Sequence, residues 1–222
     1  MRYRPTQPLT QARRRCLRFP WLGLAALLTC LVWVGPSAAQ TVTPSGSAPL
    51  ALCAACHGAQ GQGSVAGFPR LAGQNAGYLA QALSKFRDKS RASVIMQPIA
   101  QGLSDDQIQQ MAAYFSAQHP APIVAASPPA AALVQAGDAL AHSGASTVAS
   151  CFSCHGSDGR GVGARFPAIV GQPDVFVVAR LHEFQARAKA GGAKPGTMTA
   201  VSAQMTEAQI QEAAAFLSVS AP

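Results

Sequence analysis

The chain lacks a long hydrophobic run of the kind that crosses a membrane. Its N-terminal apolar segment, Phe19–Val34, has only 16 residues, whereas a membrane-spanning helix needs about 20. Arginines precede this segment, and the small residues Ser37, Ala38 and Ala39 follow it. This order is typical of a secretory signal peptide, so we predict that residues 1–39 are removed after Ala39. An uncleaved leader that anchors the protein at the membrane is the alternative.

Acidic residues are scarce, but the imbalance of charge comes from the leader. The whole chain has 17 Lys and Arg against 9 Asp and Glu, a net charge of +8. Six of the arginines and none of the acids lie in residues 1–39, so the remainder has 11 basic and 9 acidic residues, or +2. The high overall charge therefore gives no support for a nucleic-acid partner.

Cysteine is missing outside two short motifs, once Cys16 and Cys30 of the leader are set aside. The other four cysteines lie in the sequences CAACH at residues 53–57 and CFSCH at residues 151–155. No cysteine is left for a disulfide bond, which excludes a disulfide scaffold even in an oxidising compartment.

Both motifs have the pattern C-x-x-C-H, which is the attachment site of a c-type haem. The two cysteines can each form a thioether with one vinyl group of the porphyrin, and the histidine can then ligate the iron. A lone C-x-x-C also occurs in redox dithiols and zinc sites, but the adjacent histidine and the duplication favour haem. We predict two covalent c-type haems, attached at Cys53 and Cys56 and at Cys151 and Cys154, with His57 and His155 as iron ligands.

The two motifs belong to an internal sequence repeat that occurs twice along the chain. At a shift of 98 residues, Phe68-Pro69 aligns with Phe166-Pro167, and Gly73-Gln74 aligns with Gly171-Gln172. Farther along, the shift becomes 102, so the second copy carries four extra residues near 188–196. We predict a first cytochrome c domain over 40–120, a Pro- and Ala-rich linker over 121–132 and a second domain over 133–222.

The chain also lacks the alternation of apolar and polar residues that strands require, whereas helical periodicity is clear. Apolar residues recur at helical spacing in four segments: 79–86, 108–115, 177–184 and 210–217. Ser104 with Gln107, and Thr206 with Gln209, have the spacing of a capping box before the last helix of each copy. We therefore predict an all-α fold in which each domain is a few short helices around one haem. The porphyrin would supply the apolar mass that so small and aromatic-poor a domain lacks.

Each iron also needs a ligand opposite its histidine, and methionine is a usual choice in c-type cytochromes. Met111 lies on the apolar face of the predicted last helix, and Met205 aligns with Leu103, so both are expected in the core. Met96 and Met198 align with each other, and we expect both in loops, because the segments around them contain Pro or Gly. We predict that Met96 and Met198 are the second iron ligands.

The remaining histidines have no histidine counterpart in the other copy, so we expect His119, His142 and His182 to face solvent. Pro69 and Pro167 each follow a ligand histidine by 12 residues. The carbonyl group of each proline could accept a hydrogen bond from the ring N–H that points away from the iron and so fix the imidazole.

Two basic features have more than one interpretation. The basic run over residues 85–91 contains Lys85, Arg87, Lys89 and Arg91. Such a run is usually a solvated face, but it could also pair with haem propionates or dock to an acidic redox partner. Arg180 occupies an apolar-face position of its predicted helix, where it could extend toward solvent or contact a propionate or the domain interface.

Together these residues resemble the di-haem cytochrome c4 family, in which two class I cytochrome c domains stand in tandem. The resemblance is carried by six segments: Cys53–Gly58, Phe68–Gln74, Tyr78-Leu79, Phe86-Arg87, Met96 and Leu103–Asp105. The second copy departs from the family pattern, because its ligand-bearing segment has a Gly- and Ala-rich insertion. The resemblance implies facing haem domains with propionates near the interface and export to the bacterial periplasm. An uncleaved leader would associate the protein with the membrane surface.

The function implied by this resemblance is one-electron transport in a respiratory chain toward a terminal oxidase. The partners would be an oxidase, a cytochrome bc complex or a dehydrogenase. No enzymatic activity is expected, because iron with both axial positions filled leaves no open site for a substrate. One alternative is the electron-transfer subunit of a periplasmic dehydrogenase, for example of sulfur compounds. Less expected is a haem peroxidase, which needs an open iron site, and zinc binding or thiol redox chemistry is a remote third.

Overall fold

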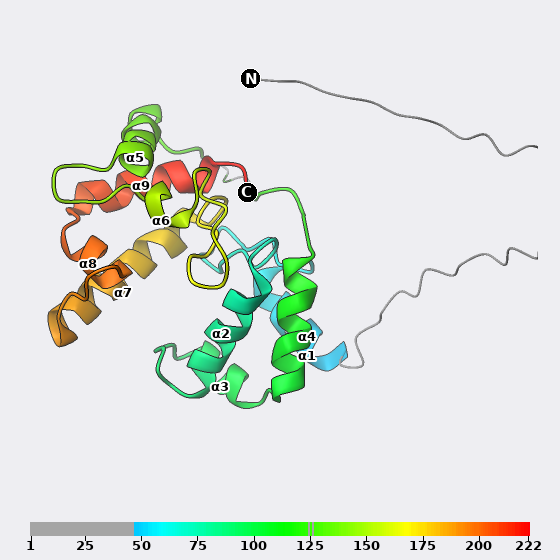
Figure 1. Cartoon of the computed structure of the whole chain (residues 1–222). Coiled ribbons are helices and arrows are strands. Elements are labelled where there is room, and N and C mark those ends of the chain that lie inside the picture. Colours follow the sequence, from blue (N-terminus) through cyan, green and yellow to red (C-terminus); the bar gives the residue numbers. More distant parts are fainter. Residues whose placement is uncertain (1–46, 124, 126) are drawn as a thin grey trace, which may run out of the picture. The chain divides into compact units, whose positions relative to one another are not determined.

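The computed structural model describes residues 47–222 except 124 and 126 (Figure 1). The predicted leader, 1–39, and the start of the predicted first domain therefore lie outside the described residues. The described residues form helices and connecting loops with two isolated bridges and no strand, which confirms the all-α fold class. Within this part of the chain, no helix is long and apolar enough to span a bilayer.

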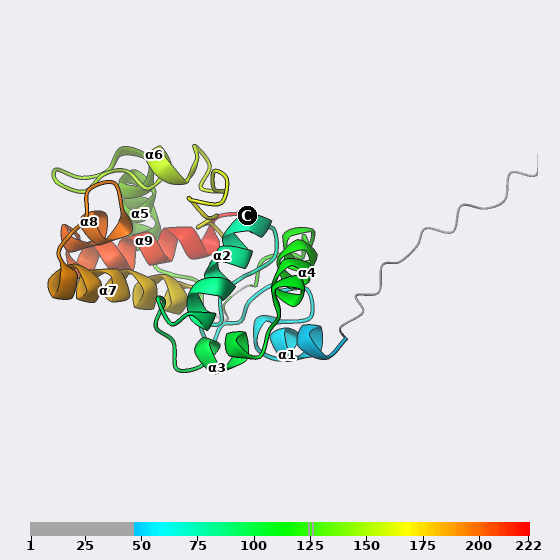
Figure 2. The same ribbon diagram turned by 60° about the horizontal axis from the view of Figure 1, so that its bottom comes forward.

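The helices fall into two groups along the chain, as Figures 1 and 2 show. The first group is α1 (Ser47–His57), α2 (Ala76–Arg87), α3 (Met96–Gln101) and α4 (Asp105–Ser116). The second group is α5 (Ala131–Ser143), α6 (Phe152–His155), α7 (Asp174–Gly191), α8 (Met198–Ala203) and α9 (Glu207–Val219).

Three pairs of helices correspond between the repeats, namely α2 with α7, α3 with α8 and α4 with α9. The four extra residues of the second repeat lengthen a helix rather than a loop: α7 has 18 residues and α2 has 12, while the following loop is shorter in the second repeat. Helix α5 was not predicted, and it begins at Ala131, inside the last two residues of the expected linker. The predicted domain boundaries themselves stay predictions.

Each repeat has its own apolar core, built from the periodic positions. In the first repeat, α2 packs on α4 through a cluster that includes Leu79, Ile108 and Phe115. In the second repeat, α9 packs on α5 and α7 through Leu140, Val177, Leu181, Ile210 and Leu217. Both predicted capping boxes are present, at Ser104 and Thr206, and they satisfy free backbone N–H groups where α4 and α9 begin. Met111 and Met205 are buried, as expected.

Candidate functional site

The first C-x-x-C-H motif forms the last turns of α1, which ends at His57. A helical C-x-x-C segment brings its two thiols to one side, because residues three apart are neighbours on a helix. Gly58 follows with φ +84°, a backbone conformation that glycine adopts easily, and the chain turns away there. The second motif has the same design, with α6 ending at His155 and Gly156 at φ +87°. All four motif cysteines are free of disulfide bonds.

Both histidines are held by the proline carbonyl groups that the sequence predicted. The Nδ1–H of His57 donates to the carbonyl oxygen of Pro69 at 2.9 Å, and that of His155 donates to Pro167 at 2.7 Å. A carbonyl oxygen can only accept, so Nδ1 carries the ring proton in each case and Nε2 keeps its lone pair for a metal. This confirms the predicted role of both prolines.

The surroundings of the two rings also favour the neutral form that metal binding requires. Burial lowers the pKa of His57 and of His155, while the hydrogen bonds to Pro69 and Pro167 oppose this shift. The Phe68 ring meets the His57 ring edge-to-face at 6.2 Å between centroids. Phe166 meets His155 in the same way at 6.1 Å. A neutral, oriented imidazole with a free Nε2 is suited to ligate iron.

The first cysteine of each motif lacks the lowered pKa of a redox dithiol. Burial raises the pKa of the Cys53 thiol, and it raises the pKa of Cys151 to about 11. Dithiol catalysts and zinc sites use thiolates, whose pKa values are lowered by their surroundings. Thiols kept protonated in this way do not support the dithiol and zinc alternatives.

Met96 and Met198 occupy the same structural position in the two repeats. Each is the first residue of a short helix, α3 or α8, and each is half-buried. We expected both in loops, but a helical turn begins at each residue. Pro98 is compatible with the first turn of α3, because that turn does not need the N–H group that proline lacks. Iron ligation by Met96 and Met198 stays a prediction.

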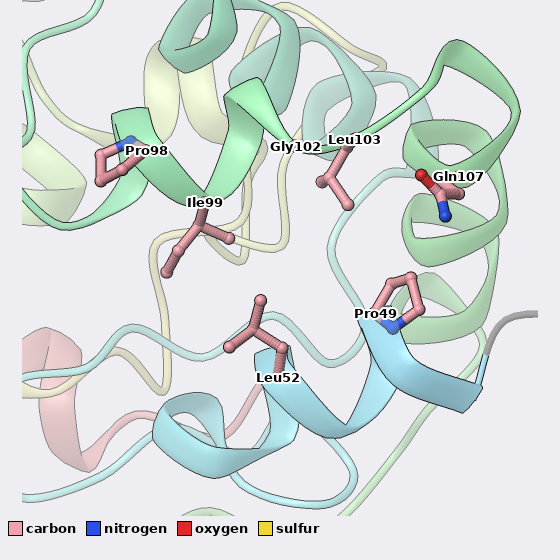
Figure 3. Close-up of a pocket in the computed structure, with 7 residues that line it drawn as sticks. All are labelled: Pro49, Leu52, Pro98, Ile99, Gly102, Leu103 and Gln107. Carbon is pink, nitrogen blue, oxygen red and sulfur yellow. The ribbon is translucent and has the colours of Figure 1, made fainter.

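A pocket of about 510 Å³ lies between the motif helix of the first repeat and the helix that begins at Met96 (Figure 3). Its lining is mainly apolar: Pro49, Leu52, Pro98, Ile99, Gly102, Leu103 and Gln107. Leu52 of α1 and Ile99 of α3 point into this space from opposite sides. None of the predicted haem donors lines this pocket, although Leu52 precedes Cys53 and Pro98 lies two residues after Met96. An apolar hollow of this kind suits part of a porphyrin.

Buried guanidinium groups supply a second test of the fit to haem. Arg70 is 4% exposed and donates to the carbonyl groups of Pro120 and Ala121. Arg91 lies over the Phe86 ring. Burial lowers the pKa of both arginines, and the positive charge of Arg180 lowers that of Arg91 further. Among the described residues, the buried Nε–H groups of Arg70 and Arg91 have no hydrogen-bond acceptor. Carboxylates such as haem propionates satisfy groups of this kind, so these residues fit the cofactor.

The basic run does not form one solvated face. Lys85 and Lys89 are exposed. Arg87 instead pairs with Asp105 at 2.6 Å, and Arg91 is partly buried beside Arg180. Arg180 forms an ion pair with Glu183 and lies over the Phe184 ring at 4.2 Å, so it does not simply extend into solvent. Its positive charge lowers the pKa of Arg91 in the other repeat.

The three remaining histidines lie as expected. His119, His142 and His182 are all exposed. His182 pairs with Glu207 at 2.7 Å, and His142 lies near Asp138 at 3.1 Å. The His142 ring also meets the ring of Phe152, a residue of the second C-x-x-C-H motif, edge-to-face at 4.7 Å between centroids.

Sequence reasoning missed Gln74 and Gln172, which join the two repeats by hydrogen bonds. Both side chains are buried. The Gln74 side chain bonds to the backbone of Ala168, and the Gln172 side chain bonds to the backbone of Arg70. The repeated Gly-Gln pair was a visible signal, but nothing in one copy indicated that its partner lies in the other.

A cytochrome c family model matches this chain twice, over residues 46–118 and 141–220. The "Thiosulfate dehydrogenase electron acceptor" of Stutzerimonas stutzeri strain A1501 is 40% identical over 175 residues, which cover 77% of this chain and 81% of that protein.

Solved structures of related proteins have the same fold. Cytochrome c4 from Acidithiobacillus ferrooxidans is 34% identical, with a TM-score of 0.65 and coverage of 75% of this chain and 97% of the other. Thiosulfate dehydrogenase from Marichromatium purpuratum is 33% identical with a TM-score of 0.66, and the match covers 77% of this chain and 36% of that longer chain.

Proposed function

The chain belongs to the cytochrome c family and is a di-haem electron carrier of the cytochrome c4 type, and from this premise we propose that it accepts electrons from a thiosulfate dehydrogenase in the periplasm. The observation that carries this proposal is the similarity to a relative that is named as the acceptor of such an enzyme. A terminal oxidase is the proposed destination of the electrons. Export with removal of residues 1–39 would bring the chain to this compartment.

The proposed sites use the chain's own donors in two equivalent sets. Cys53 and Cys56 hold the first haem, with His57 and Met96 on its iron. Cys151, Cys154, His155 and Met198 do the same in the second repeat. When bound, each haem supplies an iron centre that gains and loses one electron. The proposed haem domains are residues 40–120 and 133–222, joined by the linker 121–132.

The same residues argue against catalysis on a substrate. The Pro69 carbonyl keeps the His57 ring in one tautomer and orientation, and Met96 would fill the opposite position. A soft thioether favours ferrous iron, so a haem with His and Met ligands has a higher reduction potential than a haem with two His ligands. A peroxidase would need one of these positions to open. We therefore propose a carrier that is not itself an enzyme.

The proposed docking surface for the dehydrogenase lies on the first repeat. Leu52 is 51% exposed beside the motif, and Val94 and Ile95, which precede Met96, are also exposed. Lys85 and Lys89 add positive charge on the segment that leads to this loop. An apolar patch rimmed by charge is typical of a transient protein interface.

Stopped-flow mixing of the oxidised holoprotein with a purified thiosulfate dehydrogenase and thiosulfate tests the proposal. We expect both haems to become reduced, and thiosulfate without the enzyme to reduce neither. The double variant Lys85→Gln/Lys89→Gln should slow reduction at low salt, because long-range attraction speeds encounter. Lys189→Gln, an exposed lysine of the second repeat, is the matched control. A holoprotein that dithionite reduces fully, but that the enzyme does not reduce, would contradict the proposed donor.

A further inference from the structure

The two repeats are joined by a symmetric pair of glutamine side chains. The Arg70 N–H donates to Gln172 Oε1 at 3.0 Å, and Gln172 Nε2 donates to the Arg70 carbonyl oxygen at 3.0 Å. In the reciprocal pair, the Ala168 N–H donates to Gln74 Oε1 at 3.1 Å, and Gln74 Nε2 donates to the Ala168 carbonyl oxygen at 2.7 Å. Arg70 and Ala168 are equivalent at the shift of 98 residues. The glutamine side chain of each repeat therefore forms hydrogen bonds with the same backbone position of the other repeat.

These hydrogen bonds reach the histidines through a single peptide group. The Arg70 N–H belongs to the peptide unit whose carbonyl is that of Pro69, and that carbonyl accepts the Nδ1–H of His57. The Ala168 N–H likewise shares its peptide unit with the Pro167 carbonyl that accepts from His155. Two hydrogen bonds, with one peptide group between them, thus connect Gln172 to His57. An equivalent pair connects Gln74 to His155.

The direction of these bonds is fixed by chemistry. A backbone N–H can only donate, so it meets Oε1 of the glutamine, and a backbone carbonyl can only accept, so it meets Nε2. Gln74 and Gln172 are 4% and 5% exposed, so water does not compete with these contacts. The glycine before each glutamine has positive φ, +73° at Gly73 and +70° at Gly171, and this turn directs the chain into the contact.

We propose that Gln172 and Gln74 are positioning residues that tune the iron ligand of the opposite domain. An acceptor on a peptide N–H polarises the peptide and makes its carbonyl oxygen a stronger acceptor. A stronger acceptor on Nδ1–H makes the imidazole more electron-donating. Such a ligand stabilises ferric iron and lowers the potential. Each glutamine therefore lowers the reduction potential of the haem in the other domain.

This inference rests on the proposed ligation by His57 and His155, and crossed variants of the holoprotein test it. Gln172→Met keeps the side-chain length but removes both hydrogen bonds to Arg70. Potentials are measured for each haem by an NMR redox titration. The resonances are assigned to their domains through Phe68 and Phe166, whose rings lie against His57 and His155.

In Gln172→Met, we expect the potential of the haem on His57 to rise by more than that of the haem on His155. In Gln74→Met, the larger rise should occur at the haem on His155. Gln118→Met removes a hydrogen bond within the first repeat, to the Tyr114 carbonyl oxygen, and should leave both potentials unchanged.

Equal shifts of both haems in each variant would mean that the glutamines only hold the domains together, and the inference would fail. A larger shift at the haem of the variant's own domain, or no shift at all, would also overturn it. Hyperfine-shifted signals from both histidine rings, seen in the same spectra, report the ligation independently. Their presence without crossed shifts would refute the inference and leave the proposed sites intact.

Discussion

At the scale of single residues, the two histidines predicted to ligate iron are oriented and kept neutral by groups of the chain itself. A proline carbonyl fixes the tautomer, and burial lowers the pKa of the ring. The hydrogen bond follows from the spacing of 12 residues between His and Pro in each repeat, which is why the sequence could predict it, whereas the burial of the rings depends on the fold and was not predicted. The partners of Gln74 and Gln172 lie 94 and 102 residues away in sequence. Such contacts depend on how the domains dock, and no local pattern encodes that.

The proposed methionine ligands, Met96 and Met198, give the prediction at this scale. Met198→Ala should remove the sulfur-to-ferric-iron absorption band of the haem on His155 and keep that of the other haem, so about half of the band should be lost. Met96→Ala should remove the other half. Met205→Leu is the control, because Met205 is a buried core residue and its loss should leave the band unchanged. The band is measured in optical spectra of the oxidised proteins. An undiminished band in Met198→Ala would exclude Met198 as an iron ligand.

At the scale of helices, the periodic segments were predictable and the others were not. Helices α2, α4, α7 and α9 cover the four segments with helical apolar spacing. The short helices α3 and α8 have only six residues each, too few for a period to show. Helix α5 follows a Pro- and Ala-rich segment whose composition indicated a linker, and packing against α9 outweighs that local preference.

The crossing of α5 and α9 yields a prediction about stability. A Cβ atom at Gly137 would clash with the Glu212 carbonyl oxygen and lie 2.6 Å from Phe216 Cβ. Gly137→Ala should therefore push the helices apart and destabilise the second domain by about 1–3 kcal/mol. For a domain of this size, that lowers Tm by about 4–8 °C for each kcal/mol.

Gly191→Ala is the matched control for this prediction. Gly191 is the last residue of α7, and a Cβ there meets nothing within 4 Å. This change should leave stability unchanged or raise it by up to about 1 kcal/mol, because alanine has less freedom in the unfolded chain. Thermal unfolding of both holoproteins makes the comparison. Equal Tm values would show that α5 and α9 do not cross closely at Gly137.

At the scale of the whole molecule, the internal repeat provides two haem domains, and these two domains meet at an interface. The glutamine pair and the arginines at positions 91 and 180 lie where the repeats meet. The repeat and the number of haems could be predicted, because each depends on local spacing, and the donor residues stay a prediction. The polar interface could not be predicted, since it brings together residues that are distant in sequence.

A spectroelectrochemical titration of the purified holoprotein tests the central claim, that this chain carries single electrons on two haems with both axial positions filled. Reduction should consume two electrons per chain in one-electron steps, and the spectra should stay low-spin in both oxidation states. Uptake of a single electron, or a high-spin haem in the resting protein, would contradict this account.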